Sequence, residues 1–155
     1  MGDIMSGSTS LIVRTVTLED AAAIHSLNSQ ALKYDYPLAD TRRRIESIAS
    51  RPSSAILVAC RGGQVVGYVQ GDILEATYTA PMVKIEALAV NADQRYLGVG
   101  RALMHSIEQW AGHHGVDDIL LNSGEERTGA HDFYAAIGYE RGKKEVHFTR
   151  HLRTE

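Results

Sequence analysis

Apolar and polar positions fall into short runs along most of the chain, and these runs predict both strands and helices. Strands are indicated by apolar or alternating runs at residues 11–16, 55–60, 65–74, 83–90 and 118–122. Between residues 98 and 115 the apolar side chains instead recur at spacings of three and four, as they do on one face of a long helix. The chain is therefore expected to mix helices and strands.

Local signals set the remaining helices. Thr17 and Asp20 have the spacing of a capping box, which predicts a helix that runs to about residue 33. A second helix is predicted over about 40–50. A last one is predicted over about 128–137, because Gly138 stands where a left-handed C-cap is needed.

Turn and strand signals complete the order of elements. Gly62 and Gly63 separate two strand-like runs and predict a hairpin, and Pro81 is predicted to end the loop before the strand at 83–90. Two more strands are predicted near the end of the sequence, at 139–141 and over the alternating run 146–152. The order β-α-α-β-β-β-α-β-α-β-β predicts an α/β or α+β fold with helices on the faces of one sheet.

Composition narrows the class of protein. With 155 residues, 44% apolar and 23% charged, the chain fits one ordinary globular domain. The net charge of −3 argues against a nucleic-acid partner, and no apolar run is long enough to span a membrane. A single cysteine, Cys60, allows neither an internal disulfide nor a cysteine-based zinc site, and no metal-ligand spacing is present. The cytosol is the expected location.

A glycine turn joins the predicted strand at 83–90 to the predicted long helix. Gly98 and Gly100 let the backbone approach a ligand closely, and the first amides of the helix form an anion site that Arg95 and Arg101 supplement with charge. A P-loop is excluded, because Lys and Ser or Thr do not follow Gly100. A dinucleotide-binding fingerprint would need a third glycine, and Leu103 stands at that position. A glycine-rich turn that only starts a helix remains an alternative interpretation.

Two motifs together resemble the GNAT superfamily of N-acetyltransferases. Arg95-x-x-Gly98-x-Gly100 is similar to motif A of that family, and Asn122-Ser123-Gly124 followed by Ala130-x-x-Phe133-Tyr134 is similar to its second signature. The resemblance extends from about Leu11 to Leu152. It implies a mixed, mostly antiparallel central sheet with helices on both faces, in a single N-acetyltransferase domain over 11–152 behind a flexible leader over 1–10.

The resemblance also implies acetyl-CoA as co-substrate, with its pyrophosphate on the glycine turn and its pantetheine arm along the preceding strand. The amide matching Leu88 would polarise the thioester carbonyl. The family often carries Asn where this chain has Arg127, so Asn122 and Arg127 are both candidates for contact with the pantetheine. The other implied cofactor-binding residues are Leu88, Ala89, Val90, Arg95, Tyr96, Leu97, Gly98, Val99, Gly100 and Arg101.

Acetyl transfer to an amine needs a proton donor for the departing thiolate, and Tyr134 matches the family's tyrosine near the CoA sulfur. An aromatic core residue is the alternative for Tyr134. Glu86 lies in an apolar strand, two residues before Leu88 and therefore on the same expected face. It is a candidate base acting through water, an anchor for a cationic substrate, an exposed side chain or half of an ion pair.

Other side chains could line the acceptor cleft. They are the acids Asp35, Asp72 and Glu75 and the loop tyrosines Tyr34 and Tyr36. The resemblance therefore implies an N-acetyltransferase, which we expect to move acetyl to a primary amine of a small molecule by direct attack in a ternary complex. A protein N-terminus or lysine as acceptor, and a non-catalytic acyl-CoA sensor, are the alternatives. A homodimer stays open, because no interface is indicated.

Overall fold

The computed structural model describes residues 10–95 and 97–153, which divide into two compact units that meet in sequence between Asn122 and Ser123. The first unit contains a five-stranded sheet in the order β1-β2-β3-β4-β5. Neighbouring strands are antiparallel except β4 and β5, which are parallel, so the prediction of a mixed, mostly antiparallel sheet is confirmed. The strands are β1 (Leu11–Thr15), β2 (Ser54–Arg61), β3 (Gln64–Ala76), β4 (Thr79–Val90) and β5 (Asp118–Leu121).

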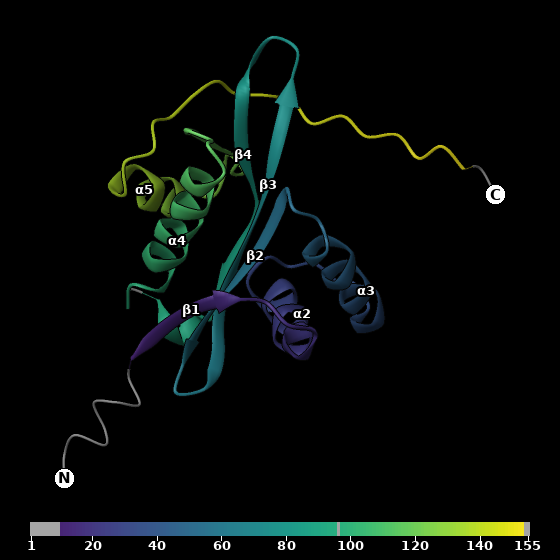
Figure 1. The fold of residues 1–155 in the computed structure, drawn as a ribbon, viewed down its shortest axis with the longest axis vertical. Helices are drawn as coiled ribbons and strands as arrows, with labels where there is room; N and C mark the ends of the chain where they lie inside the picture. Colours follow the sequence, from purple (N-terminus) through teal and green to yellow (C-terminus); the bar gives the residue numbers. More distant parts are fainter. Residues whose placement is uncertain (1–9, 96, 154–155) are drawn as a thin grey trace. The chain divides into compact units, whose positions relative to one another are not determined.

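Helices cover both faces of this sheet, as the sequence predicts (Figure 1). Helices α2 (Ala21–Gln30) and α3 (Leu38–Ala49) lie on one face, and α4 (Val99–His113) lies on the other. Two short 3-10 turns, η1 (Leu18–Asp20) and η2 (Ala92–Gln94), precede α2 and α4. The second unit contains α5 (Thr128–Ala136), which is followed by Gly138 at φ +103°, the predicted left-handed position.

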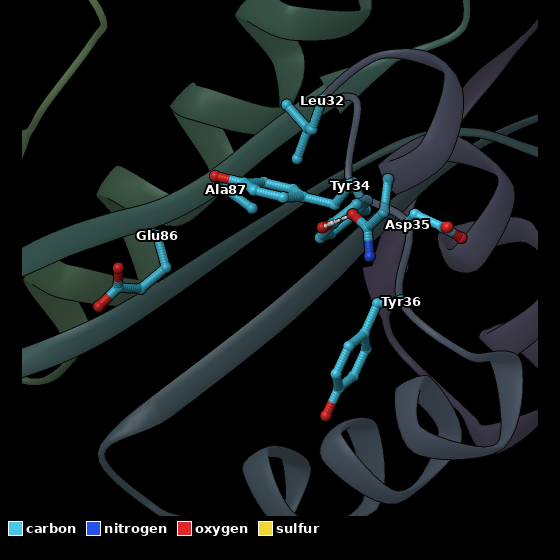
Figure 2. A pocket seen from close by; sticks show the side chains of 8 residues that line it. Leu32, Tyr34, Asp35, Tyr36, Glu86 and Ala87 are labelled. Carbon is cyan, nitrogen blue, oxygen red and sulfur yellow. Dashed lines mark hydrogen bonds between the residues drawn. The ribbon is translucent and has the colours of Figure 1, made fainter. Parts of the chain in front are cut away.

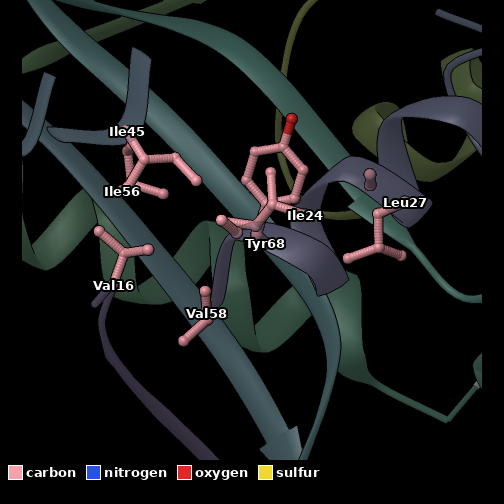
Figure 3. Close-up of a cluster of buried hydrophobic side chains, with 9 residues drawn as sticks. Val16, Ile24, Leu27, Ile45, Ile56, Val58 and Tyr68 are labelled. Atoms are coloured by element: carbon pink, nitrogen blue, oxygen red, sulfur yellow. The ribbon is translucent and has the colours of Figure 1, made fainter. Parts of the chain in front are cut away.

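A hydrophobic core fills the space between α2, α3 and the sheet. Ile24 and Leu27 of α2 and Ile45 of α3 pack against Val58 and Tyr68 of the central strands (Figure 3). Burial of one such aliphatic side chain contributes about 2 kcal/mol. This cluster therefore fixes the two helices over the half of the sheet that will form one wall of the site.

On the opposite face, two glycines let α4 approach β3 closely. A Cβ at Gly67 would lie 3.0 Å from a methyl of Val99, and one at Gly71 would lie 3.1 Å from Ile107. Tyr68, the residue directly after Gly67, faces the α2 side, as alternation along a strand requires. These contacts hold α4 close to the sheet both at its N-terminal residue, Val99, and near its middle, at Ile107.

The capping box is formed, but the helix that follows it is shorter than predicted. Asp20 accepts a hydrogen bond from the backbone N–H of Thr17 at 2.8 Å. The Arg14 guanidinium binds both oxygens of this buried carboxylate, at 2.8 and 2.9 Å, and lowers the pKa of Asp20. The helical segment opens with η1 and ends at Gln30, and Lys33 adopts φ +64°, which a helix cannot continue through.

The two hairpins differ from each other in how well the sequence predicts them. Gly62 and Gly63 have φ of +60° and +80° and form the predicted turn between β2 and β3. Pro81 was expected to end a loop, yet it lies inside β4, which begins at Thr79. It stands at an irregularity in the pairing with β3, where the missing N–H of proline removes no regular hydrogen bond.

The predicted strands at 139–141 and 146–152 are wrong for the part of the chain that the structure describes. Residues 139–153 carry no strand, and the apolar side chains of the alternating run, Val146, Phe148 and Leu152, are exposed, Phe148 to 87%. Alternation marks a strand-like face, but a strand also needs the backbone of a neighbour. Within 123–153 the described residues offer one helix and no strand to pair with.

Candidate functional site

The glycine turn before α4 has the backbone geometry of an anion site. Gly98 adopts φ +84°, and a Cβ placed on it would meet nothing within 4 Å. The first hydrogen bond of the helix runs from Ala102 N to Gly98 O at 3.0 Å. The amides of Val99, Gly100 and Arg101 precede it and therefore lie outside the ladder of the helix. The open space beside Gly98 lies next to these donors.

Charged side chains surround this turn. Arg95 and Arg101 are both exposed, and Tyr96 lies outside the described residues. Arg61, which carries no recognisable motif in the sequence, braces the turn from β2: its Nε donates to Gln94 Oε1 at 3.0 Å, and its Nη2 reaches Leu97 O at 3.4 Å. No sequence motif connects Arg61 to residues more than thirty positions away.

Strand β4 is open on one side next to the turn. Strand β5 pairs with β4 only from Met82 to Ile85. Leu88, Ala89 and Val90 pair with β3 on their other side and have no strand partner on the β5 side within the described ranges. Their outward-directed backbone groups are therefore positioned to hydrogen-bond an extended ligand.

A bulge in β4 turns Glu86 toward the α2 side of the sheet. The pairing passes from Gln70↔Ala87 to Gly71↔Ile85, so Glu86 is an extra residue on β4. Glu86 and Ala87 consequently line the same cavity. The expectation that Glu86 shares a face with Leu88 is wrong, because the bulge interrupts the regular alternation of side chains.

This cavity, which we call the acceptor cavity, has a volume of about 320 Å³ (Figure 2). Its walls come from α2, the loop between α2 and α3, β3 and β4. Two carboxylates, Asp35 and Glu86, lie on it, and Glu86 Oε1 is 3.8 Å from Lys84 Nζ on the same strand. The lining residues are Asn28, Leu32, Tyr34, Asp35, Tyr36, Tyr68, Glu86 and Ala87.

The structure thus brings together several predicted acceptor residues and leaves others out. Tyr34, Tyr36, Asp35 and Glu86 all line the acceptor cavity, whereas Asp72 and Glu75 do not. Asp72 instead accepts a hydrogen bond from Gln70 at 3.2 Å.

Sequence patterns gave no indication of Asn28, Leu32, Tyr68 and Ala87 as cavity residues. The Tyr68 hydroxyl donates to Asn28 Oδ1, and burial raises the pKa of this phenol to about 12. The phenol therefore stays neutral at any physiological pH. The two partners are 40 positions apart, and no local pattern signals that they meet.

In the second unit, Tyr134 lies on α5 among other aromatic rings. Its ring is 5.2 Å from that of Phe133 and 6.1 Å from that of Tyr139, centroid to centroid. Burial raises the pKa of Tyr134, against a smaller opposing effect of the Arg127 charge. The phenol is therefore protonated at neutral pH, which is the state that a proton donor needs.

The two candidates for contact with the pantetheine, Asn122 and Arg127, lie in different units of the chain. Asn122 is a residue directly after β5, at the end of the first unit. Arg127 is an exposed residue directly before α5, and its backbone N–H donates to Gly124 O at 3.0 Å. His131 Nε2 lies 2.9 Å from the same carbonyl oxygen, so this ring stabilises the start of α5.

Two general features bear on the chemistry. Within residues 10–95 and 97–153, no cluster of three or more His, Cys, Asp or Glu side chains could hold a metal ion. No helix in these ranges has the length and apolar character that crossing a bilayer requires.

Comparison with known proteins identifies the class. The model of the acetyltransferase (GNAT) family matches residues 21–139, so the chain belongs to this family and is an acyltransferase enzyme. The resemblance found in the sequence motifs is confirmed.

Individual relatives support the same class. The chain is 27% identical over 142 residues to an aminoglycoside N(6')-acetyltransferase type 1 of Stenotrophomonas maltophilia, covering 88% of this chain and 90% of that protein. It is 26% identical over 143 residues to the uncharacterized N-acetyltransferase YhfO of Bacillus subtilis (strain 168), covering 88% and 94%. Its fold matches that of AAC(6')-Iy in complex with the bisubstrate analog CoA-S-monomethyl-acetylneamine, with a TM-score of 0.82 at 18% identity over 93% of this chain and 100% of that one.

Proposed function

We propose that this enzyme transfers the acetyl group of acetyl-CoA to a primary amine of a small molecule, by direct attack in a ternary complex. The observation that carries the proposal is the bulge in β4. On one side of this strand the backbone of Leu88–Val90 is open, and around Glu86 the same strand enters the acceptor cavity. A thioester laid along the open edge would therefore lie close to an amine held in the cavity.

The cofactor end of the proposal is supported by the backbone of the glycine turn. A pyrophosphate suits the amides of Val99, Gly100 and Arg101, because a helix N-terminus stabilises negative charge. Arg95 and Arg101 add charge-assisted donors, and the open space beside Gly98 leaves room for the phosphates. The pantetheine amides would pair with the open edge of β4 as an added strand does.

The acceptor end is supported by the charges of the acceptor cavity. Asp35 and Glu86 attract a protonated amine, and Glu86 would take one proton from it through water, leaving the neutral nucleophile. The amine nitrogen then forms a bond to the thioester carbon, the carbon–sulfur bond breaks, and the nitrogen releases its second proton to water. The backbone N–H of Leu88 is proposed to hydrogen-bond the carbonyl oxygen, where negative charge develops.

The departing thiolate needs a proton, and we propose Tyr134 as the donor. Its support is local to residues 123–153: the side chain matches the tyrosine of the family motif, and burial keeps its phenol protonated. Asn122 and Arg127 remain the proposed contacts to the pantetheine. The name of the Stenotrophomonas relative makes an aminoglycoside one acceptor to test among small-molecule amines.

Calorimetric titration with acetyl-CoA, with NADH as the control nucleotide, tests the cofactor site. One-site binding of acetyl-CoA alone is expected. Release of free thiol from acetyl-CoA is then followed with and without added amines. Release that depends on an amine supports the enzyme, whereas binding without amine-dependent release would indicate an acyl-CoA sensor. If acetyl-CoA does not bind, the proposal is withdrawn.

A further inference from the structure

A second cavity adjoins the acceptor cavity. Its volume is about 190 Å³, and it lies among α2, α3, β2 and β3. Its apolar lining comes from side chains on three of these elements. They are the isoleucines Ile24, Ile45, Ile48 and Ile56.

The two cavities share three lining side chains. Asn28, Tyr36 and Tyr68 line both of them, and the hydrogen bond from the Tyr68 hydroxyl to Asn28 fixes two of these three side chains. Figure 2 shows that the loop tyrosines diverge: the ring of Tyr34 lies toward Ala87 on β4, whereas Tyr36 points away from Glu86. The two cavities therefore adjoin at the three shared side chains, and one of these, Tyr36, is exposed.

Two polar side chains at the second cavity, those of Thr41 and Gln70, already have hydrogen-bond partners. Thr41 Oγ1 donates to Pro37 O at 3.1 Å, and Gln70 Nε2 donates to Asp72 Oδ2 at 3.2 Å. Arg44 lines the cavity as an exposed residue of α3. A polar ligand group placed against the isoleucines would lose its hydrogen bonds to water, and these side chains offer none in return. The second cavity therefore favours an apolar ligand group.

We infer that the acceptor is a primary amine carrying a compact apolar group, with the amine beside Glu86 and Asp35 and the apolar group in the second cavity. This inference rests on the proposed function. The size fits a single ring, since benzene occupies an engineered apolar cavity of about 150 Å³ in another protein. A polyhydroxylated, polycationic amine would instead bring its hydroxyl and ammonium groups against the isoleucines.

The test compares acetylation of phenethylamine, n-propylamine and an aminoglycoside by the wild-type enzyme. We expect phenethylamine to have a KM at least about tenfold below that of either other amine, because burial of the ring adds binding energy. Ile48→Phe should fill the second cavity and reduce this advantage over propylamine to about twofold or less. Ile12→Phe, a change at an exposed position of β1 that lines neither cavity, should leave the advantage unchanged.

A binding measurement that needs no turnover accompanies the kinetics. In a methyl NMR spectrum, phenethylamine should shift the δ1 methyls of the four cavity isoleucines but not that of Ile12, and propylamine should shift neither set. If phenethylamine has no advantage and the methyls do not respond, while some amine is acetylated, the inference is overturned and the proposed function stands. If the methyls respond but no amine is acetylated, the cavity binds as inferred and acetyl transfer is the claim that fails.

Discussion

The turn before α4 is formed by backbone groups, whereas the acceptor cavity is formed by side chains. The turn presents backbone amides, and the one residue type it requires is glycine at the left-handed position, Gly98. The acceptor cavity presents side chains, which arrive from α2, a loop and two strands. A backbone-built site keeps its ligand while most side chains around it change. In a side-chain-built site, a substitution at a lining residue changes the surface that the ligand contacts.

The largest expected effect comes from Gly98→Glu, which changes the glycine turn and leaves the lining of the acceptor cavity unchanged. A carboxylate at this position would occupy the open space in front of the helix amides, and φ +84° is strained for any side chain. We expect acetyl-CoA binding to be lost in calorimetry. Gly112→Glu places the same charge near the other end of α4 and should bind normally. Normal binding by Gly98→Glu would show that the pyrophosphate lies elsewhere.

Tyr134→Phe tests whether acetyl transfer needs a side chain that belongs neither to the glycine turn nor to the lining of the acceptor cavity. Loss of the proposed proton donor should lower kcat at least about tenfold, with acetyl-CoA affinity nearly unchanged. Because burial raises the pKa of Tyr134, the basic limb of the wild-type kcat profile should lie at a higher pH than a solvent-exposed phenol would give. Tyr78→Phe, at an exposed hairpin position, is the control. A kcat equal to that of the wild type would exclude Tyr134 as the acid.

Glu86→Gln attacks the side-chain-built region. We expect the acceptor's KM to rise about three- to tenfold, or kcat to fall, because the variant neither attracts the ammonium group nor accepts its proton. Acetyl-CoA titration should be unaffected. Glu75→Gln, on an exposed part of β3, should change neither quantity. If KM and kcat both match those of the wild type, Glu86 is only the partner of Lys84.

The smallest functional effect is expected from Asp20→Asn, which lies outside both regions. It removes the charge that Arg14 binds and should lower the free energy of unfolding by about 2 kcal/mol at pH 7 without changing KM. The folded state holds the pKa of Asp20 below 3.8, so this stabilisation is present above that pH and is lost as pH falls through the folded pKa. Denaturant unfolding at pH 7 and pH 3 should show the difference shrinking. A constant difference would contradict the charge pairing.

The features that could be predicted from the sequence are those encoded within a few residues. Gly98, the Gly62-Gly63 turn and the Thr17–Asp20 capping box each depend on local backbone preferences, and all three form. The bulge at Glu86 depends on how β4 pairs with β3, and alternation along β4 alone predicted the wrong face. The pairing of Tyr68 with Asn28 joins residues from different elements.

The C-terminal run also shows that a local pattern of side chains does not determine which segments pair. Val146, Phe148 and Leu152 have the alternation of a strand, yet the described residues 123–153 supply no strand for them to pair with. A pattern of side chains can mark which face of a segment is apolar. It cannot supply the hydrogen-bonding neighbour that a strand requires.

The close contact of α4 with β3 has a consequence for how such an enzyme can diversify. Gly67 and Gly71 fix α4 against one face of the sheet, and the acceptor cavity opens on the other face. Mutations in the loop around Tyr34 and Tyr36 can therefore accumulate without moving the helix end that carries the amides. A library of variants confined to that loop would vary the amine that is bound while leaving the acetyl-CoA site unchanged. A side chain at Gly67 would instead displace α4 in every variant that carried it.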